Sequence, residues 1–565
     1  MQSVHEIDLT PKPGKHYWKN CHREWREEFI YFLLIDRFHD NHNRKPDETQ
    51  IRHYGFGNQD DLKKICGGTL KGIINHLDYI YDLGCTALWL SPLFQNNPES
   101  YHGYAIENYL EVDKRFGTKE DLEDLVTKAH ALDMRVFLDI VLHHSGNNWY
   151  YPTGLQYYYY QGAEFPFGAW RYDDRPIPKE LRNPNLYNRK GSIRNYDNYP
   201  ETRDGDFMEL KAFRMDDSPE ALSVQDMLIQ IHCYWMREVD IDGFRLDAVK
   251  HMGELAISRF CSHIREYAYK LGKRNFFFFG ELVGPEDLYN KYIGPSTSTS
   301  VDHKTIYYGL NSVLDFPLYN VLPDVIKGLT SPEKLIDRYE ALRKSASNRG
   351  EYGEFLVTFL DNHDQVGQSM KHRFGNGALP EQIIGGASFL LCALGTPCIY
   401  YGTEQGFNGS AEGDWGVREA MFSLDDTSRN VLDKSSIIYK GISKVAQLRK
   451  ESACLKFGRM YICKVSIDGL YFHFPNCKEC LLAFSRVLYD EEMIIAYNIS
   501  STETHDEYVT VGKKRKDYFK FIHGDTGKIV VEADADGIKQ FIKLKLKPMQ
   551  FVILTSAPAY RQHSV

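Results

Sequence analysis

The chain has 565 residues and a formal net charge of −9, and 42% of its residues are hydrophobic and 26% charged. This length predicts two or three domains, and the composition is that of a soluble globular protein, because a disordered chain is poorer in apolar residues. An acidic chain lacks the basic surface that nucleic-acid binding requires, so we expect no nucleic-acid partner. The 38 tyrosines fit the binding of a neutral sugar, and they fit a tyrosine-rich core equally well.

Targeting signals and metal motifs are not evident in the sequence. Residues 1–28 are charged throughout and offer no apolar core for a signal peptide, and no apolar run reaches the length of a membrane helix. The 11 cysteines are scattered, and the closest pair, Cys477 and Cys480, has no second matching pair, so we expect no zinc site. We therefore expect reduced thiols, no membrane partner and a cytoplasmic location.

Short apolar runs alternate with amphipathic stretches along the first 400 residues. The apolar runs, in chain order, are residues 29–35, 87–90, 135–142, 243–247, 276–279, 312–316, 355–360 and 398–401. Such runs fit strands that are buried on both faces, as in a parallel sheet. The helix-like stretches include residues 119–132, 221–238, 253–271, 332–345 and 380–391. Eight strands alternating with helices predict an α/β protein with a (β/α)8 TIM barrel, which builds its site where the strands end.

Two segments break this alternation. Residues 145–217 are rich in Tyr, Asn, Arg, Pro and Gly and are too long for a simple loop, so they predict a small inserted domain after strand 3. After residue 441 the pattern becomes that of alternating strands, as in 470–474, 493–497 and 551–554, which predicts a C-terminal antiparallel β-sandwich. The predicted domains are the first part of the barrel in 1–144, the insertion in 145–217, the rest of the barrel in 218–450 and the sandwich in 451–565.

Two acidic residues end consecutive predicted strands. Asp247 closes Gly-Phe-Arg-Leu-Asp and Glu281 lies in Phe-Gly-Glu-Leu, so both side chains are expected at the same barrel mouth. Arg245 lies two residues before Asp247 and therefore points to the same side, where a guanidinium keeps the carboxylate ionised. Cleaving a glycosidic bond with retention needs such a carboxyl pair, about 5–5.5 Å apart. Either acid by itself would fit a helix cap or a structural ion pair equally well.

Four segments in this order resemble the conserved regions of the α-amylase family, glycoside hydrolase family 13. They are residues 139–144, 243–251, 279–284 and 359–364, and further matches are residues 67–72, 101–104 and 395–404. The similarity runs from about residue 29 to the C-terminus. Chance agreement of ordered motifs at predicted strand ends is very improbable, so the chain is identified as a member active on α-1,4-glucans.

The resemblance implies roles for individual residues. Asp247 is the implied nucleophile, Glu281 the general acid/base, and Asp364 the third carboxylate, which holds sugar hydroxyls at the cleavage subsite. Substrate-binding roles are implied for Tyr104, His102, His144, Arg245, Lys250, His251 and His363. Tyr104 would stack beneath the sugar, while Lys250 and His251 match the dipeptide that α-1,4-glucan enzymes use at the leaving-group side.

The sequence departs from the family where calcium is concerned. The family places a calcium-binding Asn where this chain has His143, and calcium prefers oxygen donors. Met208 and Glu209 replace Pro and Asp of another family segment, and residues 40–43 fit either a calcium loop or an ordinary solvated loop. We expect no cofactor for the chemistry and assign no metal ligand, and a structural calcium ion is left open.

Three functions remain to be separated. The leading one is hydrolysis of α-1,4-glucans or maltooligosaccharides by double displacement through a covalent glycosyl-Asp intermediate. The second is transglycosylation, in which a sugar hydroxyl replaces water at the same intermediate. The third is an inactive partner-binding subunit, which Asp247, Glu281 and Asp364 argue against because such proteins lose these carboxylates.

Overall fold

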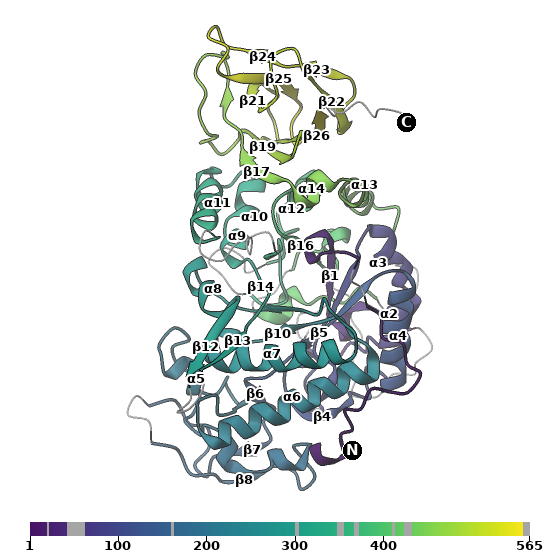
Figure 1. The fold of residues 1–565 in the computed structure, drawn as a ribbon, viewed down its shortest axis with the longest axis vertical. Coiled ribbons are helices and arrows are strands. Elements are labelled where there is room, and N and C mark those ends of the chain that lie inside the picture. Colours follow the sequence, from purple (N-terminus) through teal and green to yellow (C-terminus); the bar gives the residue numbers. More distant parts are fainter. Residues whose placement is uncertain are drawn as a thin grey trace.

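The structure is a computed structural model that describes residues 1–19, 22–41, 63–159, 163–299, 304–346, 355–365, 372–409, 413–422 and 432–556. Three parts follow one another along the long axis of the molecule (Figure 1): the inserted strands lie at one end, the barrel in the middle and the C-terminal strands at the other end.

Eight parallel strands form the barrel, which confirms the predicted fold class. They are β1 (Ile30–Leu33), β2 (Ala87–Leu90), β5 (Arg135–Ile140), β10 (Gly243–Leu246), β11 (Phe277–Gly280), β14 (Ser312–Val313), β15 (Val357–Thr358) and β16 (Thr396–Tyr400). Their order in the sheet is β14-β11-β10-β5-β2-β1-β16-β15, and a parallel bridge between Leu314 and Val357 joins the two edge strands. Each strand overlaps one of the eight apolar runs in the sequence.

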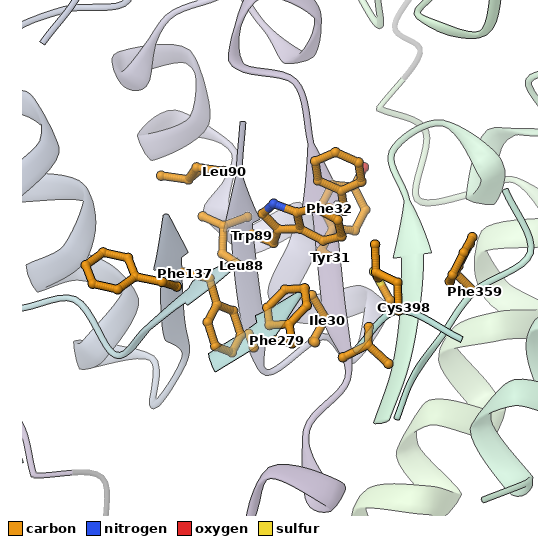
Figure 2. Packing of buried hydrophobic residues seen from close by; sticks show 14 of the residues in the cluster. Ile30, Tyr31, Phe32, Leu88, Trp89, Leu90, Phe137, Phe279, Phe359 and Cys398 are labelled. Atoms are coloured by element: carbon orange, nitrogen blue, oxygen red, sulfur yellow. The ribbon is translucent and has the colours of Figure 1, made fainter. Parts of the chain in front are cut away.

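Aromatic rings fill the barrel interior (Figure 2). Phe32 of β1 stacks on Trp89 of β2 with ring centroids 3.7 Å apart. Trp89 then meets Phe279 of β11 edge-on at 5.2 Å, and Phe279 meets Phe137 of β5 at 5.3 Å. Strands β2 and β5 are not neighbours of β11 in the sheet, so the contacts of Trp89 and Phe137 with Phe279 cross the barrel interior. The barrel is therefore a packed core, and a substrate has access only to its mouths.

Helices cover the outside of the barrel. The longer ones are α2 (Leu70–Asn75), α3 (Leu77–Leu83), α4 (Lys119–Ala131), α6 (Pro219–Val239), α7 (Glu254–Lys270), α8 (Glu286–Tyr292), α11 (Glu333–Ala346), α12 (Pro380–Cys392) and α13 (Ile437–Glu451). The shorter ones are α1 (Ile35–Phe38), α5 (Glu201–Asp204), α9 (Phe316–Tyr319), α10 (Leu322–Ile326) and α14 (Ala453–Phe457). A capping box between Thr118 and Asp121 starts α4, which satisfies backbone N–H groups at that end. Across the described ranges, no helix has the length and apolar character needed to cross a membrane.

The chain leaves the barrel after β5 and returns to it at α6. Within this insertion β6 (His144–Ser145) pairs with β9 (Lys211–Ala212), and β7 (Trp149–Tyr150) pairs with β8 (Ala169–Trp170). Two further hairpins were not predicted, β3 (Phe94–Asn96) with β4 (Ile106–Val112) and β12 (Pro295–Thr299) with β13 (Lys304–Tyr308). The first of these leaves the barrel mouth after β2 and carries residues of the site.

Two antiparallel sheets form the C-terminal sandwich. One sheet has the order β17-β19-β20-β26-β22-β23 and the other β18-β21-β25-β24. Their strands are β17 (Arg459–Ile462), β18 (Val465–Ser466), β19 (Leu481–Leu488), β20 (Glu491–Asn498), β21 (His505–Thr510), β22 (Tyr518–His523), β23 (Lys528–Val530), β24 (Glu532–Ala533), β25 (Gln540–Leu546) and β26 (Phe551–Ser556). Residues 470–474 do not form the predicted strand, and only His473 pairs there, in an antiparallel bridge with Val465. The Asp468 carboxylate accepts the backbone N–H groups of Leu470 and Tyr471, which turns the chain there.

A buried arginine joins the sandwich to the barrel. Arg486 of β19 donates from Nη1 to the backbone oxygens of Cys392 and Ala393, at 2.8 and 2.6 Å, and from Nε to that of Gly458 at 2.9 Å. The first two oxygens lie at the C-terminal end of α12, where helix carbonyls lack partners within the helix and the helix dipole favours a cation. One side chain of the sandwich therefore satisfies backbone carbonyl groups at the C-terminal end of a barrel helix.

We expect Arg486→Ala to lower the free energy of unfolding by about 3 kcal/mol, because it leaves buried carbonyl groups unsatisfied and opens a cavity. The measurement is thermal unfolding followed by calorimetry and circular dichroism. Arg515→Ala, at an exposed arginine of the same sandwich, is the matched control. Equal melting temperatures for the two variants would show that the Arg486 contacts do not stabilise the junction.

Candidate active site

One arginine side chain binds three carboxyl groups at the mouth of the barrel. Arg245 is fully buried and donates from Nη1 to Asp139 Oδ1 at 2.9 Å and to Asp247 Oδ1 at 2.6 Å. Its Nη2 lies 3.1 Å from Glu281 Oε2. Strand register explains the geometry, because Arg245 pairs with Asp139 on β5, and Asp247 and Glu281 directly follow the paired residues Leu246 and Gly280. The predicted nucleophile and acid/base are thus brought to the two nitrogens of a single guanidinium.

Asp139 connects this arginine to the loop after β2. Its Oδ2 accepts a hydrogen bond from Trp89 Nε1 at 3.1 Å and from the Tyr104 hydroxyl at 2.9 Å. The same hydroxyl lies 2.8 Å from His363 Nε2, and the rings of Tyr104 and His363 stack at 5.5 Å. No role was predicted for Asp139. The signal that could have identified it is its position in a matched segment, on the strand next to that of Arg245.

Asp364 is held on the other side of the mouth. Arg418 Nη2 donates to Asp364 Oδ1 at 2.6 Å, and His363 Nε2 lies 3.3 Å from Asp364 Oδ2. Arg418 also donates from Nη1 to the Tyr101 hydroxyl at 3.1 Å and from Nε to the backbone oxygen of His363 at 2.8 Å. Arg418 was not predicted, since no local motif marks an arginine that reaches an acid 54 residues earlier.

The other predicted substrate-binding residues surround these acids. His102 Nδ1 accepts the Tyr104 backbone N–H at 3.0 Å, and His144 Nε2 lies 3.1 Å from the Tyr104 backbone oxygen. On the β10 side, His251 Nδ1 lies 2.7 Å from the backbone oxygen of Thr202, and Lys250 pairs with Asp197. Both partners belong to the insertion, so the inserted residues form the wall of the site beside β10.

Burial separates the proton affinities of the two central acids. It raises the pKa of Glu281 to about 8, against the opposing charge of Arg245 and with the help of the Asp247 and Asp364 charges. Burial also raises the pKa of Asp247, to about 6, and here Arg245 again opposes it. At neutral pH the arrangement therefore has one protonated and one ionised carboxyl group, as an acid and a nucleophile require. Glu281 keeps 15% of its side chain exposed, enough to reach a ligand in the mouth.

The position where the family has its calcium-binding Asn is occupied by His143. His143 is buried, its Nε2 lies 3.3 Å from the backbone oxygen of Arg203, and its ring centroid lies 4.8 Å from that of Phe207. Within the described part of the chain, no group of three or more His, Cys, Asp or Glu side chains is arranged to hold a metal ion. Of the second candidate, residues 40–43, Asp40 is buried, while residues 42 and 43 lie outside the described residues.

Comparisons with known proteins agree with this geometry. The sequence profile of the family described as alpha amylase, catalytic domain, matches residues 32–436. The chain is 30% identical over 508 residues to an alpha-amylase of Streptomyces lividans, covering 79% of this chain and 52% of that protein. It is 28% identical over 490 residues to a cyclomaltodextrin glucanotransferase of Klebsiella oxytoca, covering 80% of this chain and 68% of that protein. The chain thus spans about half the length of the Streptomyces relative.

A solved structure covers nearly the whole chain. The alpha-amylase of Geobacillus thermoleovorans, complexed with acarbose, superposes with a TM-score of 0.70 at 27% identity and covers 95% of this chain and 100% of its own. The similarity therefore extends beyond the barrel to the insertion and the C-terminal sandwich.

The raised pKa values predict a bell-shaped pH dependence of kcat/KM for cleavage of maltoheptaose. The acid limb should follow Asp247, which must lose its proton near pH 6, and the alkaline limb Glu281, which must keep its proton up to about pH 8. Initial rates at low substrate concentration between pH 4 and pH 10 measure both limbs. An alkaline limb near the ordinary pKa of a glutamic acid would contradict the role of Glu281 as proton donor.

Proposed function

The chain belongs to the α-amylase family, and from that premise we propose that it is a retaining glycoside hydrolase acting on α-1,4-glucans or maltooligosaccharides. The observation that carries the proposal is the placement of Asp247 and Glu281 on one guanidinium. Carboxyl groups bound to the two terminal nitrogens of an arginine are close together, as double displacement requires. Their different pKa values assign one to attack and the other to protonation.

In the proposed mechanism Asp247 attacks the anomeric carbon while Glu281 protonates the leaving oxygen. This forms a covalent glycosyl-Asp247 intermediate and releases the reducing-side sugar. Glu281 then removes a proton from water, which attacks the same carbon and frees Asp247. Arg245 stabilises the ionised Asp247, and Asp364, fixed by Arg418, is placed to bind hydroxyls of the sugar undergoing cleavage.

Transglycosylation is the second candidate. Similarity to cyclomaltodextrin glucanotransferases supports it, including the Klebsiella oxytoca protein and one from Bacillus at 28% identity. Both reactions share the glycosyl intermediate and differ in whether water or a sugar hydroxyl accepts the glycosyl group. The acceptor enters on the side of Lys250 and His251, where the insertion supplies Asp197 and the backbone of Thr202.

We also propose that the insertion is attached to the barrel without calcium. His143 and His251 contact the backbone oxygens of two consecutive inserted residues, Arg203 and Thr202. Phe207 packs against both imidazole rings, with centroids 4.8 and 4.5 Å away, and the two imidazole centroids are 5.8 Å apart. Imidazole nitrogen is a poor ligand for calcium, so His143 does not fit the ion that the family's Asn binds, whereas it fits a direct hydrogen bond.

For localisation we propose the cytoplasm. The described residues contain ten cysteines, all of them free thiols and nine of them buried, which suits a reducing compartment. Recovery of the native protein from the culture medium or from a membrane fraction would contradict this.

The products from maltoheptaose test the activity. Hydrolysis should give shorter maltooligosaccharides alone, whereas transfer gives longer or cyclic products, and both are resolved by chromatography. Proton NMR in the first minutes should show the new reducing end as the α-anomer, because double displacement inverts twice. Asp247→Ala should lose activity by several orders of magnitude, since the nucleophile is then missing. An initial β-anomer, or undiminished turnover by Asp247→Ala, would refute the mechanism.

The attachment without calcium predicts that EDTA leaves the melting temperature and the activity unchanged. His143→Ala should lower the free energy of unfolding by about 1–3 kcal/mol, because it removes a buried hydrogen bond to the insertion. His16→Ala, at an exposed histidine, is the control. Thermal melts with EDTA and after adding calcium measure both effects. A large drop in EDTA that calcium reverses would show that a structural ion binds despite His143.

A further inference from the structure

Two neighbouring cysteines lie just before β19 and take no part in the reaction proposed for the barrel. Cys477 and Cys480 stand at the two ends of a bend with the sequence Cys-Lys-Glu-Cys, and β19 begins directly after it at Leu481. Zinc takes four ligands, and in the part of the chain that the structure describes no group of three or more His, Cys, Asp or Glu is placed to hold a metal ion. The chemistry open to this pair is therefore that of two thiols.

The side chains of the two cysteines contact each other. Cys477 makes a side-chain hydrogen bond with Cys480. Its sulfur also lies 3.9 Å from the backbone oxygen of Glu479, so the side chain lies back over the bend toward Cys480. Rotation of the exposed Cys477 side chain can bring two sulfur atoms that are already in contact to bonding distance.

The two thiols differ in their access to solvent. Cys477 is exposed, whereas Cys480 is only 3% exposed, and burial raises the pKa of the Cys480 thiol. A reagent in solution therefore reaches Cys477 first, and Cys480 reacts with a sulfur that is already bound to Cys477. Thiol–disulfide exchange uses this division between an attacking thiol and a resolving thiol.

The other described cysteines do not combine a neighbouring thiol with access to solvent. Of the ten cysteines that the structure describes, Cys477 is the exposed one and the other nine are buried. Cys85 and Cys398 are close enough to influence each other electrostatically, but both are buried in the barrel wall. Within the described residues, we therefore expect a small oxidant to react at the bend.

The bend is anchored in the sandwich and touches the barrel. The backbone N–H of Ile499 donates to the backbone oxygen of Cys480 at 3.0 Å. On the barrel side, the backbone oxygen of Lys478 lies 3.7 Å from the position that a Cβ at Gly328 would take, between α10 and α11. Strand β19, which follows the bend, lies on the side of the sandwich next to the barrel (Figure 1). A bond across the bend would therefore restrain a segment at the junction of the two parts.

We propose that Cys477 and Cys480 are a redox-active dithiol, which a small-molecule disulfide such as oxidised glutathione converts to an intramolecular disulfide that stabilises the sandwich. The Cys477 thiolate attacks one sulfur of the small disulfide, so that a new S–S bond forms, the old one breaks and one small thiolate leaves. Cys480 then attacks the Cys477 sulfur and releases the second small thiolate. The two departing thiolates take up the two protons that the protein thiols give up. The protein pair is thereby oxidised, and the small disulfide is reduced to two thiols.

The contact between the two side chains favours the second step. Because Cys480 lies beside the mixed disulfide, its attack is intramolecular and is faster than attack by a second small thiol from solution. The product closes a loop of four residues, which restrains the unfolded chain and so favours the folded one. A small dithiol reverses the reaction by the same exchange.

The test is to incubate the reduced wild-type protein with oxidised glutathione in the absence of oxygen, block free thiols with iodoacetamide and map the peptides by mass spectrometry. Cys477 and Cys480 should be found joined, and dithiothreitol should restore both thiols. Cys480→Ser should stop at a glutathione adduct on Cys477, because the resolving thiol is missing. Cys477→Ser should leave the buried Cys480 free. Cys463→Ala, which removes another buried cysteine of the sandwich, is the control and should react like the wild type.

Two results in the wild type would overturn the dithiol: a glutathione that stays on Cys477, or two thiols that both remain open to iodoacetamide. The peptide map separates the bend from Cys21, which lies outside the described residues. Because these results come from the wild type, they decide the question even if Cys480→Ser does not fold.

Thermal melts test the effect of the disulfide on stability. The oxidised wild type should melt about 2 °C higher than the reduced protein, whereas Cys477→Ser should melt at the same temperature after both treatments. Equal melting temperatures for the oxidised and the reduced wild type would refute the stabilising role.

Discussion

The site depends on one buried positive charge shared among negative ones. Arg245 lies fully buried between Asp139, Asp247 and Glu281, and it is neutralised only because β5, β10 and β11 present their acids at the same level. Strand register places these acids at the same height in the barrel. The aromatic core packs beneath them. Removing the Arg245 charge would leave Asp139, Asp247 and Glu281 buried beside one another without a cation. Both the folded barrel and the reaction therefore depend on Arg245.

The insertion extends the site beyond what the barrel can supply. Asp139 lies on a barrel strand and Asp247 and Glu281 directly follow two others, whereas the inserted residues Thr202 and Asp197 contact His251 and Lys250 beside β10. The attachment of the insertion through His143 and His251 therefore fixes the wall of the site on that side.

Much of this arrangement could be predicted because the signals are local. Eight apolar runs gave eight strands, and acids at the ends of two of them lie together in the structure. Arg418 escaped prediction because it binds an acid across the mouth, 54 residues earlier in the sequence. Residues 470–474 alternate like a strand, but the Asp468 side chain turns the backbone first. Periodicity thus identifies buried elements reliably, and contacts between loops require the folded chain.

The contact between Arg486 and helix α12 has a consequence for synthesis of the protein. The ribosome completes α12 at residue 392, yet the cation that binds its last carbonyl groups appears 94 residues later. Until then the last carbonyl groups of α12 lack this partner. The ring of Phe389 on α12 also lacks its contact with Phe484 of β19. The C-terminal end of α12 cannot reach its final contacts until β19 has been synthesised, so this part of the barrel matures only after the first strands of the sandwich. A truncation that looks harmless to the active site would therefore act on the yield of folded protein.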